Sequence, residues 1–204
     1  MRSAADLPFV VKICGITNEE DARVAVECGA NALGFNFYPR SPRYVEPRAA
    51  KQIVDRVAGE YLKVGVFVNG RAEEIAQVTD ELTLDVLQIH GEDLCTAAPH
   101  SCSIWRAAPA DRIPKQAAAE VQAYVIDTPT TDFGGSGKSF DWGLAADLPY
   151  RFVLAGGLAA DNVKHAIETA RPWGVDACSR LESRPGKKDA QRIKEFVRAA
   201  SCAL

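Results

Sequence analysis

Short apolar runs alternate with helix-like segments along the whole chain, and this alternation limits the fold more than any other feature. Strands joined by helices form parallel sheets, because a parallel neighbour is reached only through a long crossover. Eight such units favour a closed (β/α)8 barrel, with an open doubly wound sheet as the alternative. The strands are expected at Phe9–Cys14, Ala32–Phe37, Leu62–Val68, Leu84–Ile89, Ser103–Ala107, Ala123–Asp127, Arg151–Ala155 and Gly174–Ala177.

The segments between the strands carry helix signals. Asn18 is expected to cap a helix that runs to about Cys28, with acidic residues in its first turn. Pro47 is expected at the start of the next helix, where its missing N–H costs nothing. The other helices are expected at Arg71–Val78, Glu92–Ala98, Ile113–Glu120, Trp142–Asp147, Asp161–Arg171 and Lys187–Ala200.

The length of 204 residues fits one barrel without a second domain. A (β/α)8 barrel needs roughly 200 residues, so insertions must be few. We therefore expect residues 1–204 to form a single barrel domain. The open sheet would place a G-x-G-x-x-G turn after its first strand, whereas this chain has Cys14-Gly15-Ile16-Thr17 there.

Charge and cysteine usage exclude several classes of protein. The formal net charge of −3 disfavours general binding to nucleic acid or to an anionic membrane. No apolar run reaches the ~20 residues that cross a bilayer, and the N-terminus lacks a signal-peptide pattern, so we expect a cytoplasmic protein. The six cysteines include no C-x-x-C pair, so we expect neither a metal site nor a disulfide framework.

Polar and reactive residues stand after nearly all of the apolar runs. In a (β/α)8 barrel the carboxyl ends of the strands form one face, and that face holds the active site. The sequence therefore predicts one site assembled from distant parts of the chain. Its first candidates are Cys14, Arg43, His90, Arg106, Asp127, Gly156, Gly157, Cys178 and Ser179.

Cys14 and Asp127 are the candidates for acid–base chemistry. Strand alternation puts Lys12 on the same face as Cys14, and a nearby ammonium favours the thiolate of a general base or nucleophile. Asp127 would stand at the barrel mouth, where a carboxylic acid can donate a proton. The simpler alternatives are a buried cysteine beside a lysine, and a carboxylate that caps the loop beginning at Thr128.

An anion site is expected after the seventh and eighth strands. Barrel enzymes often bind phosphate there through backbone N–H groups, and Gly156-Gly157 lets the backbone approach closely. The planar fork of Arg43 suits a carboxylate or phosphate, and His90 is a candidate to orient the substrate. The glycine-rich segment 134–139 is not a P-loop, because Asp132 stands where the motif needs glycine, and we expect it to form a lid.

In chain order these motifs resemble the phosphoribosylanthranilate isomerase family of tryptophan biosynthesis, and the resemblance covers most of the chain. The matching segments are Lys12–Thr17, Gly34–Pro39, Ser41–Tyr44, Val64–Asn69, Leu87–Glu92, Asp127–Thr128, Gly134–Lys138, Phe140–Trp142, Ala155–Leu158, Asn162–Val163, Gly174–Asp176 and Pro185–Asp189.

The resemblance implies an aldose–ketose isomerase that needs no cofactor. It would convert N-(5-phosphoribosyl)anthranilate to 1-(2-carboxyphenylamino)-1-deoxyribulose 5-phosphate, as the third step of tryptophan biosynthesis. Asp127 would protonate the furanose ring oxygen, and Cys14 would remove the C2′ proton. Arg43 matches the family's arginine on the anthranilate side, while Gly157 and Ser179 fall in its phosphate-binding loops. The expected partner is this small phosphorylated substrate, and the resemblance leaves monomer and homodimer open.

The chain departs from the family after the eighth strand. The family often reads Ser-Ser-Gly-Val-Glu, and this chain has Cys178-Ser179-Arg180-Leu181-Glu182. The missing glycine removes a position where the backbone easily takes a positive φ and offers its N–H to phosphate. Our hypothesis is that Arg180 binds phosphate through its backbone or its side chain. An arginine that points into solvent is the alternative.

Two other functions stay open at this point. A related barrel isomerase of the histidine pathway acts on a different phosphosugar, but it uses a carboxylate pair and shows a half-barrel repeat. This chain has Cys14 at the base position and no evident repeat. A non-catalytic phosphate-binding barrel would need neither Cys14 nor Asp127.

Overall fold

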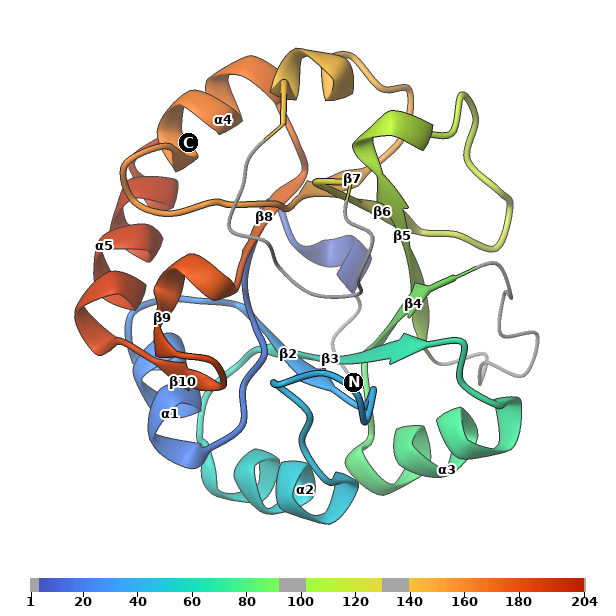
Figure 1. Ribbon diagram of the computed structural model, residues 1–204, viewed down its shortest axis with the longest axis vertical. Helices are drawn as coiled ribbons and strands as arrows, with labels where there is room; N and C mark the ends of the chain where they lie inside the picture. Colours follow the sequence, from blue (N-terminus) through green and yellow to red (C-terminus); the bar gives the residue numbers. More distant parts are fainter. Residues whose placement is uncertain (1–3, 92–101, 130–139, 204) are drawn as a thin grey trace.

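Eight parallel strands close into a barrel in the order β1 to β8, and β8 pairs with β1. Figure 1, a view of the computed structural model, shows this closure. The structure describes residues 4–91, 102–129 and 140–203. The predicted (β/α)8 barrel is therefore confirmed, and the open sheet is wrong. The strands are β1 Val10–Cys14, β2 Ala32–Asn36, β3 Leu62–Val68, β4 Val86–His90, β5 Ser103–Pro109, β6 Ala123–Asp127, β7 Phe152–Leu154 and β8 Gly174–Ala177.

In Figure 1 the described α-helices pack around the outside of the barrel, and the short turn η2 lies beside β5 and β6. The α-helices are α1 Glu19–Glu27, α2 Pro47–Arg56, α3 Ala72–Leu82, α4 Val163–Ala170 and α5 Ala190–Ser201, with short 3-10 turns η1 Ala4–Asp6, η2 Ala110–Arg112, η3 Trp142–Ala145 and η4 Ser179–Leu181. Among the described residues, no helix is long and apolar enough to span a membrane.

The first two helices begin where the sequence predicts. The side chain of Asn18 accepts a hydrogen bond from the backbone N–H of Asp21 at 3.0 Å, so it caps α1. Pro47 is the first residue of α2. The predicted helix Glu92–Ala98 and the predicted lid at 134–139 lie outside the described residues.

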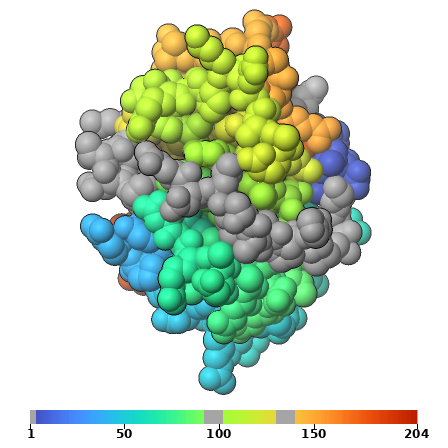
Figure 2. Space-filling model, turned by 90° about the vertical axis from the view of Figure 1, so that its right-hand side faces the viewer, coloured from blue at the N-terminus to red at the C-terminus, as the bar shows by residue number. Residues whose placement is uncertain are grey.

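The predicted helix Ile113–Glu120 is wrong, because tyrosine side chains take the backbone groups that such a helix needs. In a helix the N–H of Ala118 would donate to the carbonyl of Pro114. Instead it donates to the hydroxyl of Tyr124 at 3.2 Å, and that carbonyl accepts from the hydroxyl of Tyr150. Between β5 and β6 only η2 is helical, and the yellow-green residues after β5 lie on the upper part of the face shown in Figure 2.

The last helix begins later than predicted. Lys187 and Lys188 form strand β10 (Lys187–Lys188), which pairs with β9 (Glu182–Arg184) in a hairpin. Asp189 then caps α5 by accepting from the backbone N–H groups of Gln191 and Arg192 at 2.9 and 3.0 Å. The hairpin is held against the start of α1, where the N–H of Lys188 donates to Asp21 at 2.7 Å.

Strand alternation divides the apolar core into two parts. Residues such as Ile13 and Val175 face outward and pack with the helices, whereas Val10 and its neighbours fill the lower interior, which Ala4 and Leu7 close from below. On β1 the next inward positions are the polar Lys12 and Cys14. The barrel interior therefore becomes polar toward the carboxyl ends of its strands.

Candidate active site

A cavity of about 700 Å³ opens at the carboxyl ends of the strands. All ten site candidates named from the sequence and the family resemblance line it. They are Cys14, Arg43, His90, Arg106, Asp127, Gly156, Gly157, Cys178, Ser179 and Arg180. Strand topology thus gathers residues from most of the chain into one space, which is what the alternation of apolar runs and reactive residues predicted.

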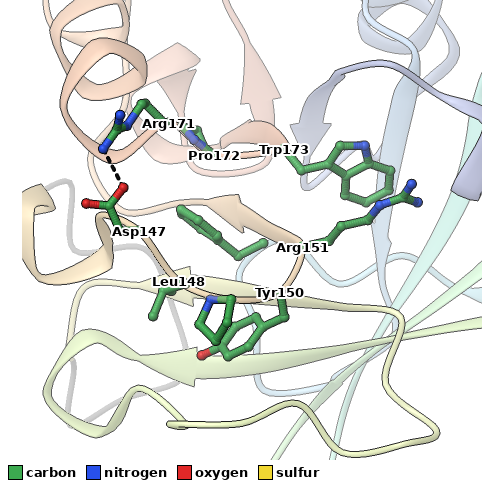
Figure 3. A pocket seen from close by; sticks show the side chains of 9 residues that line it. Asp147, Leu148, Tyr150, Arg151, Arg171, Pro172 and Trp173 are labelled. Carbon is green, nitrogen blue, oxygen red and sulfur yellow. Dashed lines mark hydrogen bonds and ion pairs between the residues drawn. The ribbon is translucent and has the colours of Figure 1, made fainter.

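A second hollow lies at the opposite, amino-terminal end of the barrel, beside β7 and β8 (Figure 3). The guanidinium of Arg151 lies 5.1 Å from the ring centre of Trp173, and Arg171 pairs with Asp147 at its rim. None of the candidate residues lines this hollow. The chemistry predicted from the sequence therefore belongs to the carboxyl-end cavity.

Lys12 lies in a buried ion pair beside Cys14. Its Nζ donates to Oδ2 of Asp176 at 2.8 Å, and the lysine is fully buried. Burial alone would lower the pKa of Lys12, but the carboxylate of Asp176 and the sulfur of Cys14 raise it above its usual value. Burial raises the pKa of Asp176 to about 7 despite the ammonium. Lys12 is therefore a permanent positive charge below the cavity floor.

Cys14 is half-buried, and its thiol is poised to ionise. A hydrogen bond from Cys178 and then the ammonium of Lys12 hold the pKa of Cys14 well below its usual range, although burial opposes them. Gly34 provides the space for this arrangement, because a Cβ there would lie 2.8 Å from Sγ of Cys14 and 3.1 Å from Nζ of Lys12. The predicted proximity of Lys12 and Cys14 is therefore present.

Asp127 has the opposite property. Burial raises its pKa to about 6, against the hydrogen bond that its Oδ1 accepts from the N–H of Thr128 at 2.7 Å. That bond is the loop-capping role weighed from the sequence, and it coexists with a carboxyl group that keeps its proton up to about pH 6. The thiol of Cys14 thus ionises at a lower pH than an ordinary thiol, and the carboxyl group of Asp127 ionises at a higher pH than an ordinary carboxyl group.

His90 contributes no charge near neutral pH. Burial lowers its pKa to about 4, so the imidazole is neutral there. Its Nε2 lies 3.0 Å from Nε2 of Gln88, which fixes the orientation of the ring. A neutral, oriented imidazole can hydrogen-bond a substrate hydroxyl or carboxyl group.

Arg43 enters the cavity already paired. Its Nε and Nη2 each donate to an oxygen of Glu182 at 2.8 Å, and Lys188 donates to the same carboxylate at 3.0 Å. Arg43 and Lys188 hold the pKa of Glu182 below its usual value despite burial. Glu182 and Lys188 could not be predicted as parts of the site, because nothing in the local sequence pattern joins them to Arg43.

The loops after β7 and β8 form the candidate phosphate site. Gly156 and Gly157 both adopt a positive φ, of +87° and +63°. Arg180 does not point into solvent, because its guanidinium donates to Asp161 at 3.0 and 2.7 Å and to the carbonyl of Gly157 at 3.2 Å. Its side-chain charge is therefore paired, and Arg180 bridges the two loops.

Comparison with known proteins agrees with this geometry. A family model described as N-(5'phosphoribosyl)anthranilate (PRA) isomerase matches residues 11–199. The N-(5'-phosphoribosyl)anthranilate isomerase of Solibacter usitatus is 44% identical over 200 residues, covering 96% of this chain and 99% of that protein. The crystal structure of phosphoribosyl anthranilate isomerase from Thermotoga maritima has a TM-score of 0.83 at 38% identity, covering 95% of this chain and 99% of that one.

A further solved structure holds a ligand. It is described as phosphoribosyl anthranilate isomerase in complex with reduced 1-(o-carboxyphenylamino)-1-deoxyribulose 5-phosphate, and it is similar to this chain with a TM-score of 0.80 and 35% identity. The similarity covers 95% of this chain and 99% of that one.

Proposed function

The chain belongs to the N-(5'-phosphoribosyl)anthranilate isomerase family, and we propose that it catalyses an Amadori rearrangement in tryptophan biosynthesis. The substrate is N-(5-phosphoribosyl)anthranilate, and the product is 1-(2-carboxyphenylamino)-1-deoxyribulose 5-phosphate. In the pathway from chorismate through anthranilate this reaction is the third step.

One observation carries the proposal: the cavity holds a thiol and a carboxyl group whose pKa values are displaced in opposite directions, with that of Asp127 raised to about 6. Asp127, as the acid, protonates the ring oxygen of the furanose, and the ring opens to a Schiff base. Cys14, as the thiolate, then takes the proton from C2′. The resulting enolamine tautomerises to the ketone, so acid–base groups suffice for every step.

The ends of the substrate are assigned by charge. Arg43 lies at the wall of the cavity, with one side of its fork on Glu182. The ion pair holds the guanidinium in place, and we assign it to the anthranilate carboxylate. The phosphate is assigned to the backbone of Gly156, Gly157 and Ser179, where positive φ at the two glycines allows close approach. His90 completes the cavity as a neutral hydrogen-bonding group.

The decisive experiment makes the substrate in place from anthranilate and a ribose phosphate donor and follows the loss of its fluorescence. Wild type, Cys14→Ala and Asp127→Asn are compared, with Cys202→Ala as a control because Cys202 is exposed and lies in the turn after α5. Rapid loss of signal in wild type and control that collapses in both site variants supports the proposal. A well-folded wild type without turnover would refute it.

A further inference from the structure

Cys14 has a second thiol beside it. β1 and β8 pair in parallel, with Lys12 opposite Asp176 and Ile13 opposite Ala177, so the next residues, Cys14 and Cys178, follow side by side. The two thiols act on each other in opposite directions, because Cys178 lowers the pKa of Cys14 and Cys14 raises the pKa of Cys178. Both residues are half-buried and line the proposed active-site cavity.

Cys178 is held on its other side by Lys188. The ammonium of Lys188 donates to Sγ of Cys178 at 3.6 Å and to the carbonyl of the same residue at 3.2 Å. The Lys188 side chain is fully buried and is fixed by Glu182 at 3.0 Å. Because an ammonium only donates, Cys178 accepts from it, and its single S–H is left to be donated to Cys14.

The space beside Cys178 is tight on the side of Gly15. A Cβ at Gly15 would lie 3.1 Å from Sγ of Cys178 and 2.8 Å from Cδ of Arg43. Glycine at position 15 therefore leaves room for the side chains of Cys178 and Arg43. The Cys178 sulfur therefore has a defined place between the Lys188 ammonium and Cys14. A donor in a fixed place is the arrangement that stabilises a developing negative charge.

We propose that Cys178 is a positioning residue for the reaction: its S–H, aligned by Lys188, donates to Sγ of Cys14 and keeps Cys14 as the thiolate that removes the C2′ proton. This inference rests on the proposed function for its catalytic consequence. The contact itself exists without substrate and can be measured without turnover.

Several charged or titratable groups other than Cys178 also act on Cys14, and they come from four strands of the barrel, one loop and the β9–β10 hairpin. They are Lys12 on β1, Arg43 in the loop after β2, His90 on β4, Asp127 on β6, Asp176 on β8 and Lys188 on β10. These groups are unchanged when only Cys178 is substituted. A change in the titration of Cys14 then reports the loss of the donor.

The test measures how the alkylation of Cys14 by iodoacetamide depends on pH. The folded, substrate-free protein is alkylated first and is then digested with trypsin. Mass spectrometry of the tryptic peptide that carries Cys14 gives the extent of alkylation. Cys178 falls in a different peptide. Cys178→Ala removes the donor, Cys178→Ser keeps one in the same place, and Cys202→Ala is the matched control. Where Cys178→Ala does not fold, Cys178→Val gives the same comparison, because it fills the space without a donor.

We expect the pH midpoint of Cys14 alkylation to rise by about one unit or more in Cys178→Ala, which corresponds to a tenfold loss of thiolate below the midpoint. In Cys178→Ser and Cys202→Ala the midpoint should stay near that of wild type. The acid limb of kcat/KM should move with it, while KM changes little. An unchanged midpoint in Cys178→Ala, or a rise of equal size in Cys178→Ser, overturns the inference.

The two proposals fail separately. If the midpoint shifts in Cys178→Ala but the wild type does not turn over the phosphoribosyl substrate, the contact between the thiols is supported and the proposed function is refuted. Turnover with an unchanged midpoint keeps the proposed function and refutes the role of Cys178.

Discussion

Arg180 and Asp161 join the loops that follow β8 and β7 through two hydrogen bonds, of 3.0 and 2.7 Å, between guanidinium and carboxylate. The same arginine also donates to the carbonyl of Gly157, a residue assigned to phosphate. The bridge therefore fixes the relative position of two loops that we expect to bind one ligand. Arg180 stands where the family resemblance predicts a glycine, so a side-chain bridge takes the place of a flexible backbone position.

Breaking this bridge should weaken substrate binding more than catalysis. We expect Arg180→Gly and Asp161→Asn each to raise KM by about two- to five-fold with little change in kcat, because a partly exposed ion pair contributes up to about 1 kcal/mol. Steady-state kinetics at low and high salt would measure this. If Arg180 instead binds phosphate directly once it is released, Asp161→Asn will lower KM, and the bridging role will be wrong.

The rate should depend on pH through the two groups with displaced pKa values. Cys14 must be ionised and Asp127 protonated, so kcat/KM should fall at pH above about 6, as Asp127 loses its proton, by about tenfold per unit at the alkaline end. The acid limb reports Cys14 and lies well below the usual range of a thiol. A pH–rate profile from pH 4 to 9 measures both limbs. A flat profile above pH 6 would assign the acid to another group.

Asp127 should cost stability at neutral pH. Its pKa of about 6 in the folded state exceeds the ordinary 3.8, so the folded protein binds the proton more tightly than the unfolded chain. Its favourable contribution is complete below about pH 4 and is lost as the pH rises through 6. We expect Asp127→Asn to be more stable than wild type at pH 7.5 by on the order of 1–2 kcal/mol, after allowance for partial exposure.

Denaturant unfolding of wild type and Asp127→Asn at pH 4 and pH 7.5 would test this expectation. Asparagine keeps an oxygen for the N–H of Thr128, so the loop contact is preserved. The advantage of the variant should disappear at pH 4. An advantage of the same size at both pH values would point to packing instead of ionisation.

Lys12 and Asp176 should be more costly to separate than to replace together. Lys12→Met leaves a buried carboxylate without its partner, and we expect a loss of about 3–5 kcal/mol in the free energy of unfolding. Combining it with Asp176→Leu should restore much of that loss. Urea unfolding of Lys12→Met, of Asp176→Leu and of the double variant gives the coupling energy. Losses that simply add would show that the two side chains act independently.

The sequence predicts those parts of the structure that local pattern determines. Apolar runs of the right length locate the strands, and Asn18 and Pro47 locate the starts of their helices, because the responsible groups are close neighbours in the chain. Cys14 and Asp127 could be placed in one cavity because strand ends meet at one face of a barrel. Each of these inferences needs only the fold class and a short window of residues.

The sequence fails where a distant side chain decides the outcome. Arg43 and Glu182 are 139 positions apart, so the ion pair that occupies Arg43 has no local signature. The segment Ile113–Glu120 contains good helix formers, yet the hydroxyls of Tyr124 and Tyr150 take its backbone groups. The contact between Cys14 and Cys178 follows from the pairing of the first strand with the last, which a barrel implies but whose register only the structure gives.

The alternation of side chains along β1 makes correct strand register a requirement for both stability and catalysis. A single strand face carries Val10 in the apolar interior, Lys12 in the buried ion pair and Cys14 at the cavity. A slip of one residue would turn all three toward the helices and would bury a charge without its partner. A misregistered molecule is therefore both inactive and unstable, so the population of folded molecules should contain few that are folded but catalytically incompetent.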